Sequence, residues 1–259
     1  MPLAGAVNAW RRGWVRMNAK EARHLGKRIA ALVNAKNLES AYALLAPVFA
    51  ERTPFAKLDL IGAALGAGSL EPVNTFLEHI GAHRTEGGWV VIGAALGQQL
   101  HRDLPGAFER CRQHILAADV WYGADILGER VPGPALVSSF APALELLAPW
   151  RADENAWIRR TTGVAVHFWA KRSRGAPELA PQAQALLGFL EPLFDERDLS
   201  AVKGVGWGLK TLGKRYPDLL AAWMAERIVL AGRQHRALML RKALTYLSEA
   251  QIAHAVGDA

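Results

Sequence analysis

Cysteine is almost absent, since Cys111 is the only one in 259 residues. The sequence therefore has neither a disulfide framework nor a CxxC metal site, and it suits a reducing compartment. No apolar run approaches the roughly 18 residues that a membrane-spanning helix requires. The basic N-terminal residues are not followed by the apolar stretch of a secretory signal. We therefore expect a cytoplasmic protein without a membrane segment.

Several catalytic and cofactor motifs are also missing. The eight histidines form no HExxH pair, and no GxSxG nucleophile motif occurs. Residues 204–211 (GVGWGLKT) resemble a phosphate-binding loop, but Leu209 stands where that motif requires glycine. The same glycines lack the βαβ context of a dinucleotide site. We expect neither a metal ion nor a cofactor.

Positive charge and tryptophan are plentiful. The formal charge is +7, the pI is about 9.8 and there are nine tryptophans. The first 30 residues carry a net charge of +6, residues 31–150 of −4 and residues 151–259 of +5. A polyanion would therefore meet the two ends of the chain more readily than its middle. The alternative is a set of ordinary solvated helix faces.

Apolar residues recur every three or four positions along nearly the whole chain, which predicts an all-α protein. Residues 61–66 (IGAALG) return as residues 92–97, and weaker echoes contain glycines at positions 123, 163 and 206. The steps between the corresponding glycines are 31, 30, 40 and 43 residues, which is typical of HEAT-like or armadillo-type helix pairs. Chance similarity in an alanine-rich sequence is the alternative.

Glycine is unfavourable inside a helix, so its recurrence indicates close approach between neighbouring helix backbones. No linker separates two independent domains. We expect one α-solenoid domain of antiparallel helix pairs over residues 17–256, preceded by a flexible basic arm over residues 1–16.

Trp121 and Asp125 lie four residues apart, so a helix places the ring and the carboxylate on one face. A carboxylate among apolar neighbours is costly to bury unless it is paired or functional. The alternative is an aspartate near a helix end with Trp121 packed in the core.

Two later segments carry basic residues on one helix face. In the first, over residues 155–174, an apolar stripe through Trp157 and Phe168 lies opposite a basic face. That face comprises Arg160, Gly163, His167, Lys171 and Arg174.

In the second segment one helix face carries a row of three lysines and a tryptophan. These are Lys203, Trp207, Lys210 and Lys214, at positions i, i+4, i+7 and i+11. The opposite face comprises Leu199, Val202, Val205, Leu209 and Leu212. An aromatic ring among cations suits a sugar-phosphate backbone, whereas the alternative is a solvated face with one tryptophan. A further basic cluster, which could extend the same surface, comprises Arg233, Arg236, Arg241 and Lys242.

These elements together resemble the AlkD-type DNA alkylation repair family of HEAT-like alkylpurine DNA glycosylases. Residues 202–210 (VKGVGWGLK), followed by residues 216–218 (YPD), resemble that family's QKAIGWxLR block and the NPD that follows it. Residues 157–160 (WIRR) are similar to its WxxR element, residues 121–125 to its WxxxD pair and residues 241–243 (RKA) to its REA. The resemblance covers about residues 115–245 and keeps the order of these elements.

The resemblance implies a role for each matched residue. Asp125 would be catalytic, and Trp121 and Trp207 would contact the sugar-phosphate of the damaged nucleotide. Arg160 would hold the DNA backbone, and we assign the same role to the basic residues near it: Lys203, Lys210, Lys214, His167, Lys171 and Arg241. Members of this family excise cationic 3-alkyladenine or 7-alkylguanine, some of them without base flipping.

The sequence therefore leads to one hypothesis and one alternative. The hypothesis is a monomeric DNA glycosylase that hydrolyses the N-glycosidic bond of cationic alkylpurines in duplex DNA, acting in base excision repair at the nucleoid. The alternative is a non-catalytic HEAT-like repeat protein that binds DNA or an acidic protein partner. Both predict salt-sensitive binding, so only base release separates them.

Overall fold

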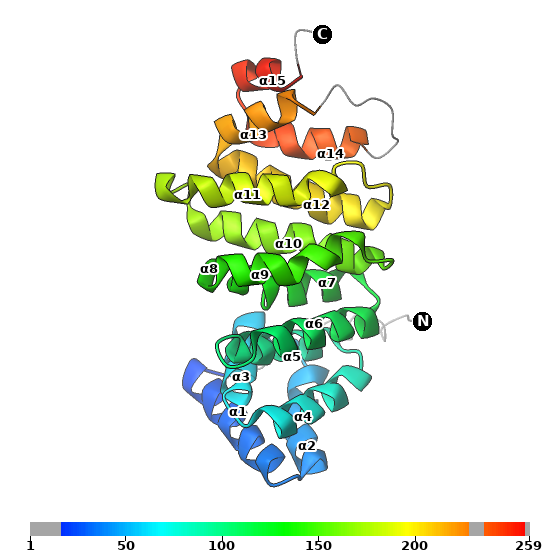
Figure 1. Ribbon diagram of the computed structural model, residues 1–259. Helices are drawn as coiled ribbons and strands as arrows, with labels where there is room; N and C mark the ends of the chain where they lie inside the picture. The colour runs from blue at the N-terminus through cyan, green and yellow to red at the C-terminus, as the bar shows by residue number, and fades with distance from the viewer. Residues whose placement is uncertain (1–16, 228–235, 257–259) are drawn as a thin grey trace, which may run out of the picture. The chain divides into compact units, whose positions relative to one another are not determined.

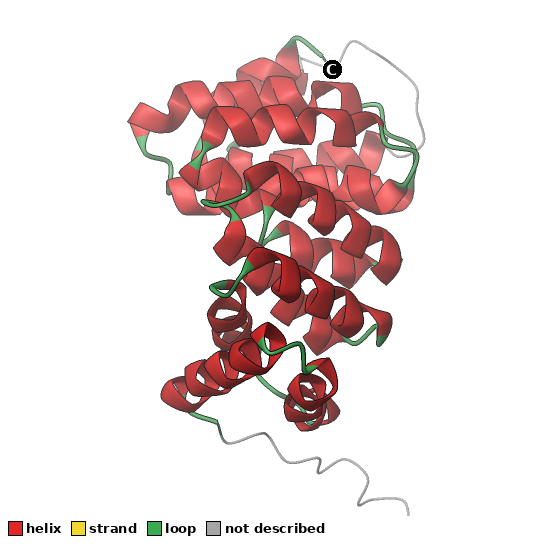
Figure 2. Cartoon of the chain, turned by 60° about the horizontal axis from the view of Figure 1, so that its bottom comes forward, coloured by secondary structure: helices red, strands yellow, loops and turns green. Residues whose placement is uncertain are grey.

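The computed structural model describes residues 17–227 and 236–256. All regular structure in these residues is helical (Figure 2), which confirms the predicted all-α fold. The α-helices are α1 (Ala19–Asn34), α2 (Leu38–Ala50), α3 (Phe55–Gly66), α4 (Leu70–Ala82), α5 (Glu86–Gln99), α6 (Leu104–Ala118), α7 (Trp121–Gly128), α8 (Pro132–Ser138), α9 (Phe140–Leu147), α10 (Ala156–Ser173), α11 (Ala180–Leu190), α12 (Leu199–Arg215), α13 (Pro217–Ala225), α14 (Arg236–Ala243) and α15 (Glu249–Val256). Short 3₁₀ turns cover Ala148–Ala152, Pro177–Leu179, Glu191–Leu193 and Leu244–Tyr246.

The chain divides into two compact units, Met1–His101 and Arg102–Ala259. The basic arm expected over residues 1–16 lies outside the described residues. A single continuous domain over residues 17–256 stays a prediction, and each unit is described by itself below.

In the first unit, α3 packs between α1 and α5. Glycines explain these contacts, Gly62 from the repeated motif and Gly26 outside it. A Cβ atom on Gly62 would lie 2.4 Å from the carbonyl oxygen of Val91, and one on Gly26 would lie 2.5 Å from that of Ile61. Because real Cβ atoms do not come so close to backbone, these helices approach through their glycines.

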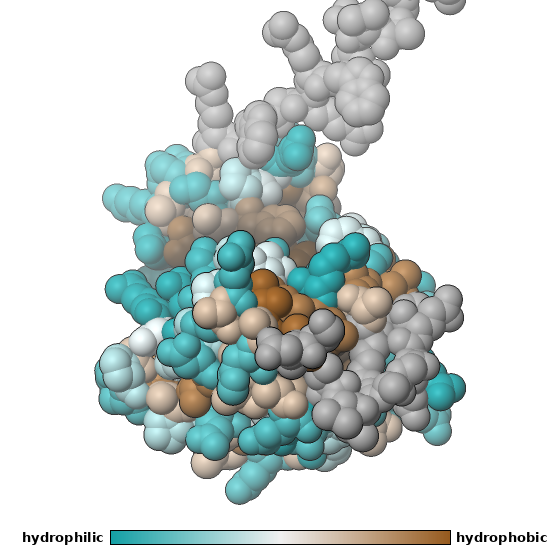
Figure 3. Space-filling view, turned by 90° about the horizontal axis from the view of Figure 1, so that it is seen from above, coloured by the Kyte–Doolittle hydropathy of each residue, from teal (hydrophilic) through white to brown (hydrophobic). Residues whose placement is uncertain are grey.

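In the second unit, α10, α12 and α14 lie side by side, with α7 and α8 against the other flank of α10 (Figure 1). Helices α11, α13 and α15 form a row beside them. Figure 3 shows the face at the C-terminal end of this unit, where hydrophobic residues lie in a central patch and in smaller areas among hydrophilic ones.

The α10–α12 crossing is the closest contact that positions the candidate site. A Cβ atom on Gly163 would lie 2.3 Å from the carbonyl oxygen of Gly204, and one on Gly204 would lie 2.5 Å from that of Arg160. The close backbone approach predicted from the glycine pattern is therefore confirmed at this crossing. The absence of a side chain at these positions brings the backbones of α10 and α12 into direct contact.

Side-chain caps fix where both helices begin. The Asn155 side chain accepts hydrogen bonds from the backbone of Trp157 and Ile158, and the Asp198 side chain accepts from Ser200 and Ala201. Such caps satisfy backbone donors that have no partner within the helix.

Two predicted core residues are placed differently. Trp157 is only half-buried because it lies in the first turn of α10, where its indole Nε1 donates to Asp119 Oδ1 at 3.0 Å. Leu199 is 44% exposed because it is the first residue of α12, ahead of the packed part of that helix. The rest of that predicted face is buried: Val202, Val205, Leu209 and Leu212.

Candidate nucleic-acid interface

An ion pair between α7 and α10 is the first feature of the candidate site. Arg160 donates from Nε to Asp125 Oδ1 and from Nη2 to Asp125 Oδ2, both at 2.7 Å. Its Nη1 donates to the carbonyl oxygen of Ser200 at 3.0 Å. The side chains are 9% and 16% exposed for Arg160 and Asp125 respectively. Such a bidentate pair fixes the plane of the carboxylate.

The sequence placed Arg160 on the basic face of its helix, and the structure buries most of this side chain. The side chain turns toward α7 and the start of α12, because the close α10–α12 crossing leaves it between these elements. The positive charge of Arg160 is paired with the Asp125 carboxylate, so less of it is available to bind a phosphate.

Trp121 begins α7 and is 56% exposed, which makes it the most exposed large hydrophobic residue described. It lies on the same helix as Asp125, one turn earlier, as the four-residue spacing predicted. Its ring meets that of Tyr122 edge-to-face, at 5.7 Å between centroids. More than half of the surface of Trp121 is therefore open to a ligand, one helix turn from Asp125.

Trp207 rests on His167. The two rings stack with 3.8 Å between centroids and 23° between planes, and His167 Nδ1 lies 2.7 Å from Thr211 Oγ1. His167 itself is only 8% exposed. Burial, and then the charge of Lys171, lower the pKa of His167 to about 4.

A buried imidazole with this pKa is neutral at pH 7, so His167 adds no charge to the basic face predicted from the sequence. Its place in the structure is beneath Trp207, where it supports the indole ring that α12 presents.

A pocket of about 370 Å³ lies where α10, α12 and α14 meet. Its wall comprises Arg160, Lys203, Trp207, Lys210, Leu238 and Lys242. The structure thus brings together five of the residues singled out in the sequence, Lys242 among them, and adds Leu238. Three lysines and one tryptophan around one hollow suit an anion joined to a flat or apolar group.

Lys242 reports the electrostatic character of this pocket. Burial lowers the pKa of its ammonium group, and the charges of Lys210, Arg160, Lys203 and Arg241 lower it further. A cation is disfavoured at this point because the surrounding charges are of the same sign. A bound anion would relieve that repulsion.

Tyr246 extends the basic surface beyond the pocket. The Nζ atoms of Lys210 and Lys214 lie 5.2 Å and 4.9 Å from the centroid of its ring, which is 47% exposed. Sequence reasoning missed Tyr246, because the turn after α14 has no helical spacing relative to α12. Lys214 itself lies outside the pocket.

The other predicted contacts are not brought into the pocket. Lys171 and Arg241 are exposed on α10 and α14. Among the further basic residues singled out in the sequence, Arg233 lies outside the described residues, as does the side chain of Arg236.

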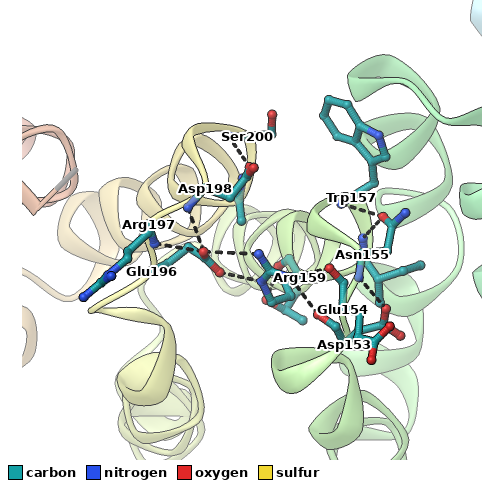
Figure 4. A network of polar contacts seen from close by, with 12 residues as sticks. Asp153, Glu154, Asn155, Trp157, Arg159, Glu196, Arg197, Asp198 and Ser200 are labelled. Carbon is teal, nitrogen blue, oxygen red and sulfur yellow. Dashed lines mark hydrogen bonds and ion pairs between the residues drawn. The ribbon is translucent and has the colours of Figure 1, made fainter. Parts of the chain in front are cut away.

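Arg159 organises the loops that precede α10 and α12 (Figure 4). It donates to both carboxylate oxygens of Glu196, at 2.6 and 3.2 Å, and to the carbonyl oxygens of Asp153 and Glu154. Glu196 in turn accepts from the backbone of Arg197 and Asp198. The network holds the two helix N-termini together, which keeps Arg160 facing Ser200.

Two classes of feature are not found within the described part of the chain. None of its helices is both long and apolar enough to cross a membrane. It also has no group of three or more His, Cys, Asp or Glu side chains arranged to hold a metal ion.

The helix pairs of the second unit and its cationic, tryptophan-lined pocket define a HEAT-like helical repeat protein. The chain belongs to the DNA alkylation repair enzyme family, whose model matches residues 90–247. This match confirms the family resemblance and contains every candidate site residue.

One solved structure extends the fold comparison. The chain is similar to Pseudomonas fluorescens alkylpurine DNA glycosylase AlkC bound to DNA containing an abasic site analog, with a TM-score of 0.53 and 17% sequence identity. The similarity covers 88% of this chain and 62% of that one, so this chain spans less than two thirds of that protein's length. No curated protein matches the chain.

Proposed function

We propose that the protein is a DNA glycosylase that releases cationic alkylated purines, 3-alkyladenine and 7-alkylguanine, from duplex DNA. The observation that carries this proposal is the Asp125 carboxylate, oriented by Arg160 and one turn away from the exposed ring of Trp121. Membership of the DNA alkylation repair enzyme family supports it, as does the fold shared with a glycosylase solved on DNA.

The leaving base needs no general acid, because alkylation at N3 or N7 already gives it a positive charge. The sugar does need help, since its transition state has oxocarbenium character. A carboxylate and electron-rich indole faces place opposing charge beside that sugar. Asp125 would stabilise the oxocarbenium ion and orient the attacking water, and Trp121 and Trp207 would cradle the deoxyribose.

The ion pair with Arg160 leaves Asp125 able to act. Each carboxylate oxygen has two lone-pair directions, and Arg160 occupies one on each. In this proposal Arg160 is a positioning residue. The phosphates are held instead by Lys203, Lys210 and Lys214, with Lys171 and Arg241 at the margins of the same surface. A protein with this substrate acts where the genomic DNA is.

The decisive experiment measures base release. The protein is incubated with methylated duplex DNA, and free 7-methylguanine and 3-methyladenine are quantified. Wild type should release one or both, and Asp125→Asn should lose at least about a hundredfold in rate, as expected when a transition-state charge is removed. Binding without any release by wild type would leave the non-catalytic alternative.

Asp119→Asn is a matched control. Asp119 is a second carboxylate nearby, and its left-handed backbone (φ 48°) tolerates asparagine, whose side-chain oxygen can still accept from Trp157. Base release by this variant should equal that of wild type. If Asp125→Asn and Asp119→Asn behaved alike, the assignment of Asp125 would be wrong.

A further inference from the structure

Lys242 lines the pocket but has no part in the mechanism above. It belongs to α14, and its aliphatic stem crosses α12 at Gly206. A Cβ atom on Gly206 would lie 2.6 Å from Lys242 Cδ and 3.2 Å from Lys242 Cβ, so the stem lies directly on the α12 backbone. The residue after Gly206 is Trp207, which shares the pocket wall. Lys242 therefore shares a pocket with the ring proposed to contact the deoxyribose.

No carboxylate within the described residues lies at ion-pair distance from Lys242. Its charged neighbours are the cations Lys210, Arg160, Lys203 and Arg241, and they lower the pKa of its ammonium group together with burial. Burial and neighbouring cations are the two ways in which a protein turns a lysine into a neutral, nucleophilic amine.

The proposed glycosylase reaction leaves a product that such an amine can attack. Loss of the purine produces an abasic deoxyribose, whose C1′ becomes an aldehyde when the sugar ring opens. Aldehydes condense with neutral amines but not with ammonium ions or guanidinium groups. The amine and the product carbon meet if the sugar remains in the pocket beside Trp207.

We propose that Lys242 captures the abasic deoxyribose as an imine, an inference that rests on the proposed function for the position of the sugar. The lone pair of Nζ attacks C1′ of the open-chain aldehyde, forming a carbinolamine. The nitrogen gives up its two protons to solvent, and the C1′ oxygen takes up two protons from solvent and leaves as water. One N=C bond is formed, one C=O bond is broken, and no oxidant or reductant takes part. Hydrolysis of the imine returns both partners.

The test uses duplex DNA that already contains a natural abasic site, in the presence of sodium borohydride, which reduces an imine to a stable amine. Wild type should give a covalent protein–DNA adduct, and peptide mass mapping should place it on Lys242. Lys242→Arg keeps the positive charge but removes the nucleophile. We expect its adduct yield to fall at least about tenfold while its affinity for a duplex with a tetrahydrofuran abasic analogue changes less than about threefold.

Three results would overturn the proposal: no adduct with wild type, an undiminished yield with Lys242→Arg, or an adduct mapped to Lys203, Lys210 or the N-terminal amine. Lys57→Arg, in the other unit, is the matched control, and its adduct yield should equal that of wild type. Since the abasic site is made beforehand, trapping does not depend on base release. Failure of imine capture and failure of the glycosylase activity are therefore observed separately.

Discussion

A guanidinium group that donates to both oxygens of one carboxylate has little capacity left for a second anion. Arg160 also donates to the carbonyl oxygen of Ser200, so its donors are directed at protein partners on two neighbouring helices. Its contribution is therefore to orientation. Asp125 is held at two points, whereas a carboxylate with a single partner would rotate.

We expect Arg160→Lys to act on the chemical step. An ammonium group keeps the charge but contacts one oxygen at a time, so the carboxylate loses its fixed plane. The rate constant kcat for base release should fall by about tenfold or more, with little change in KM. The control is Arg112→Lys on α6, which alters the ion pair of Arg112 with Asp153. A raised KM at unchanged kcat would assign Arg160 to phosphate binding instead.

The two buried histidines predict how folding depends on pH. Burial first, and then Lys171 and Arg110 respectively, lower the pKa of His167 and His114 from 6.5 to about 4. Between these values the unfolded chain binds protons that the folded protein does not. Stability is therefore complete above about pH 6.5 and decreases as the pH falls toward 4, by about 1.4 kcal/mol per pH unit for each histidine.

Urea unfolding measured from pH 7 to pH 4.5 checks this dependence. The free energy of unfolding should fall over that range in wild type and fall less steeply in His167→Gln, since one of the two titrating groups is removed. Parallel curves for the two proteins would show that His167 does not titrate as its burial indicates.

At the scale of elements, the glycines at the α10–α12 crossing decide how the site is assembled. Gly163, Gly204 and Gly208 each face backbone of the other helix, so the separation of the two helices is set by the absence of Cβ atoms. Because Arg160 lies against Gly204, any widening of this crossing also moves the partner of Asp125.

Gly204→Ala should therefore destabilise the fold and impair the site together. Its Cβ atom would meet the carbonyl oxygen of Arg160 at 2.5 Å and Cγ of Arg160 at 2.6 Å. We expect a loss of about 1–3 kcal/mol in the free energy of unfolding, as for other overpacked positions. Thermal or urea denaturation gives the measurement.

Gly188→Ala provides the matched control in the same unit. Gly188 lies in α11, and a Cβ atom at this position would have no neighbour within 4 Å, so alanine adds helix propensity without a clash. It should stabilise the protein by about 0.5–1 kcal/mol. If both substitutions changed the free energy of unfolding in the same direction, the packing explanation for Gly204 would be wrong.

Helix periodicity and glycine spacing were sufficient to predict the fold class and the close α10–α12 approach, because both are local properties of the chain. The shared face of Trp121 and Asp125 was predictable for the same reason. The burial of Arg160 and His167 was not, since it depends on which helices pack against α10. Both residues lie on a face that is polar by composition, and only tertiary contacts show that this face is covered.

At the scale of the whole molecule, the structure shows where part of the unequally distributed charge lies. Part of the positive charge of residues 151–259 surrounds one pocket and the adjoining ring of Tyr246. Sequence indicated the residue types and the row on α12. It also placed Lys242 in a further basic cluster, but not in this pocket, because that requires α14 to pack on α12 across Gly206.

This location predicts a measurable salt dependence of DNA binding. Each lysine that neutralises a phosphate releases counterions, so log K falls with log salt by about 0.9 for each such contact. Replacing Lys210 and Lys214 by Ala should reduce the slope by about 2 and weaken binding to all sequences alike. Fluorescence anisotropy at several salt concentrations measures the slope. Lys57→Ala, far from the pocket in sequence and in the other unit, is the control and should leave the slope unchanged. An unaltered slope in the variant with Lys210 and Lys214 replaced would show that the α12 row does not contact DNA.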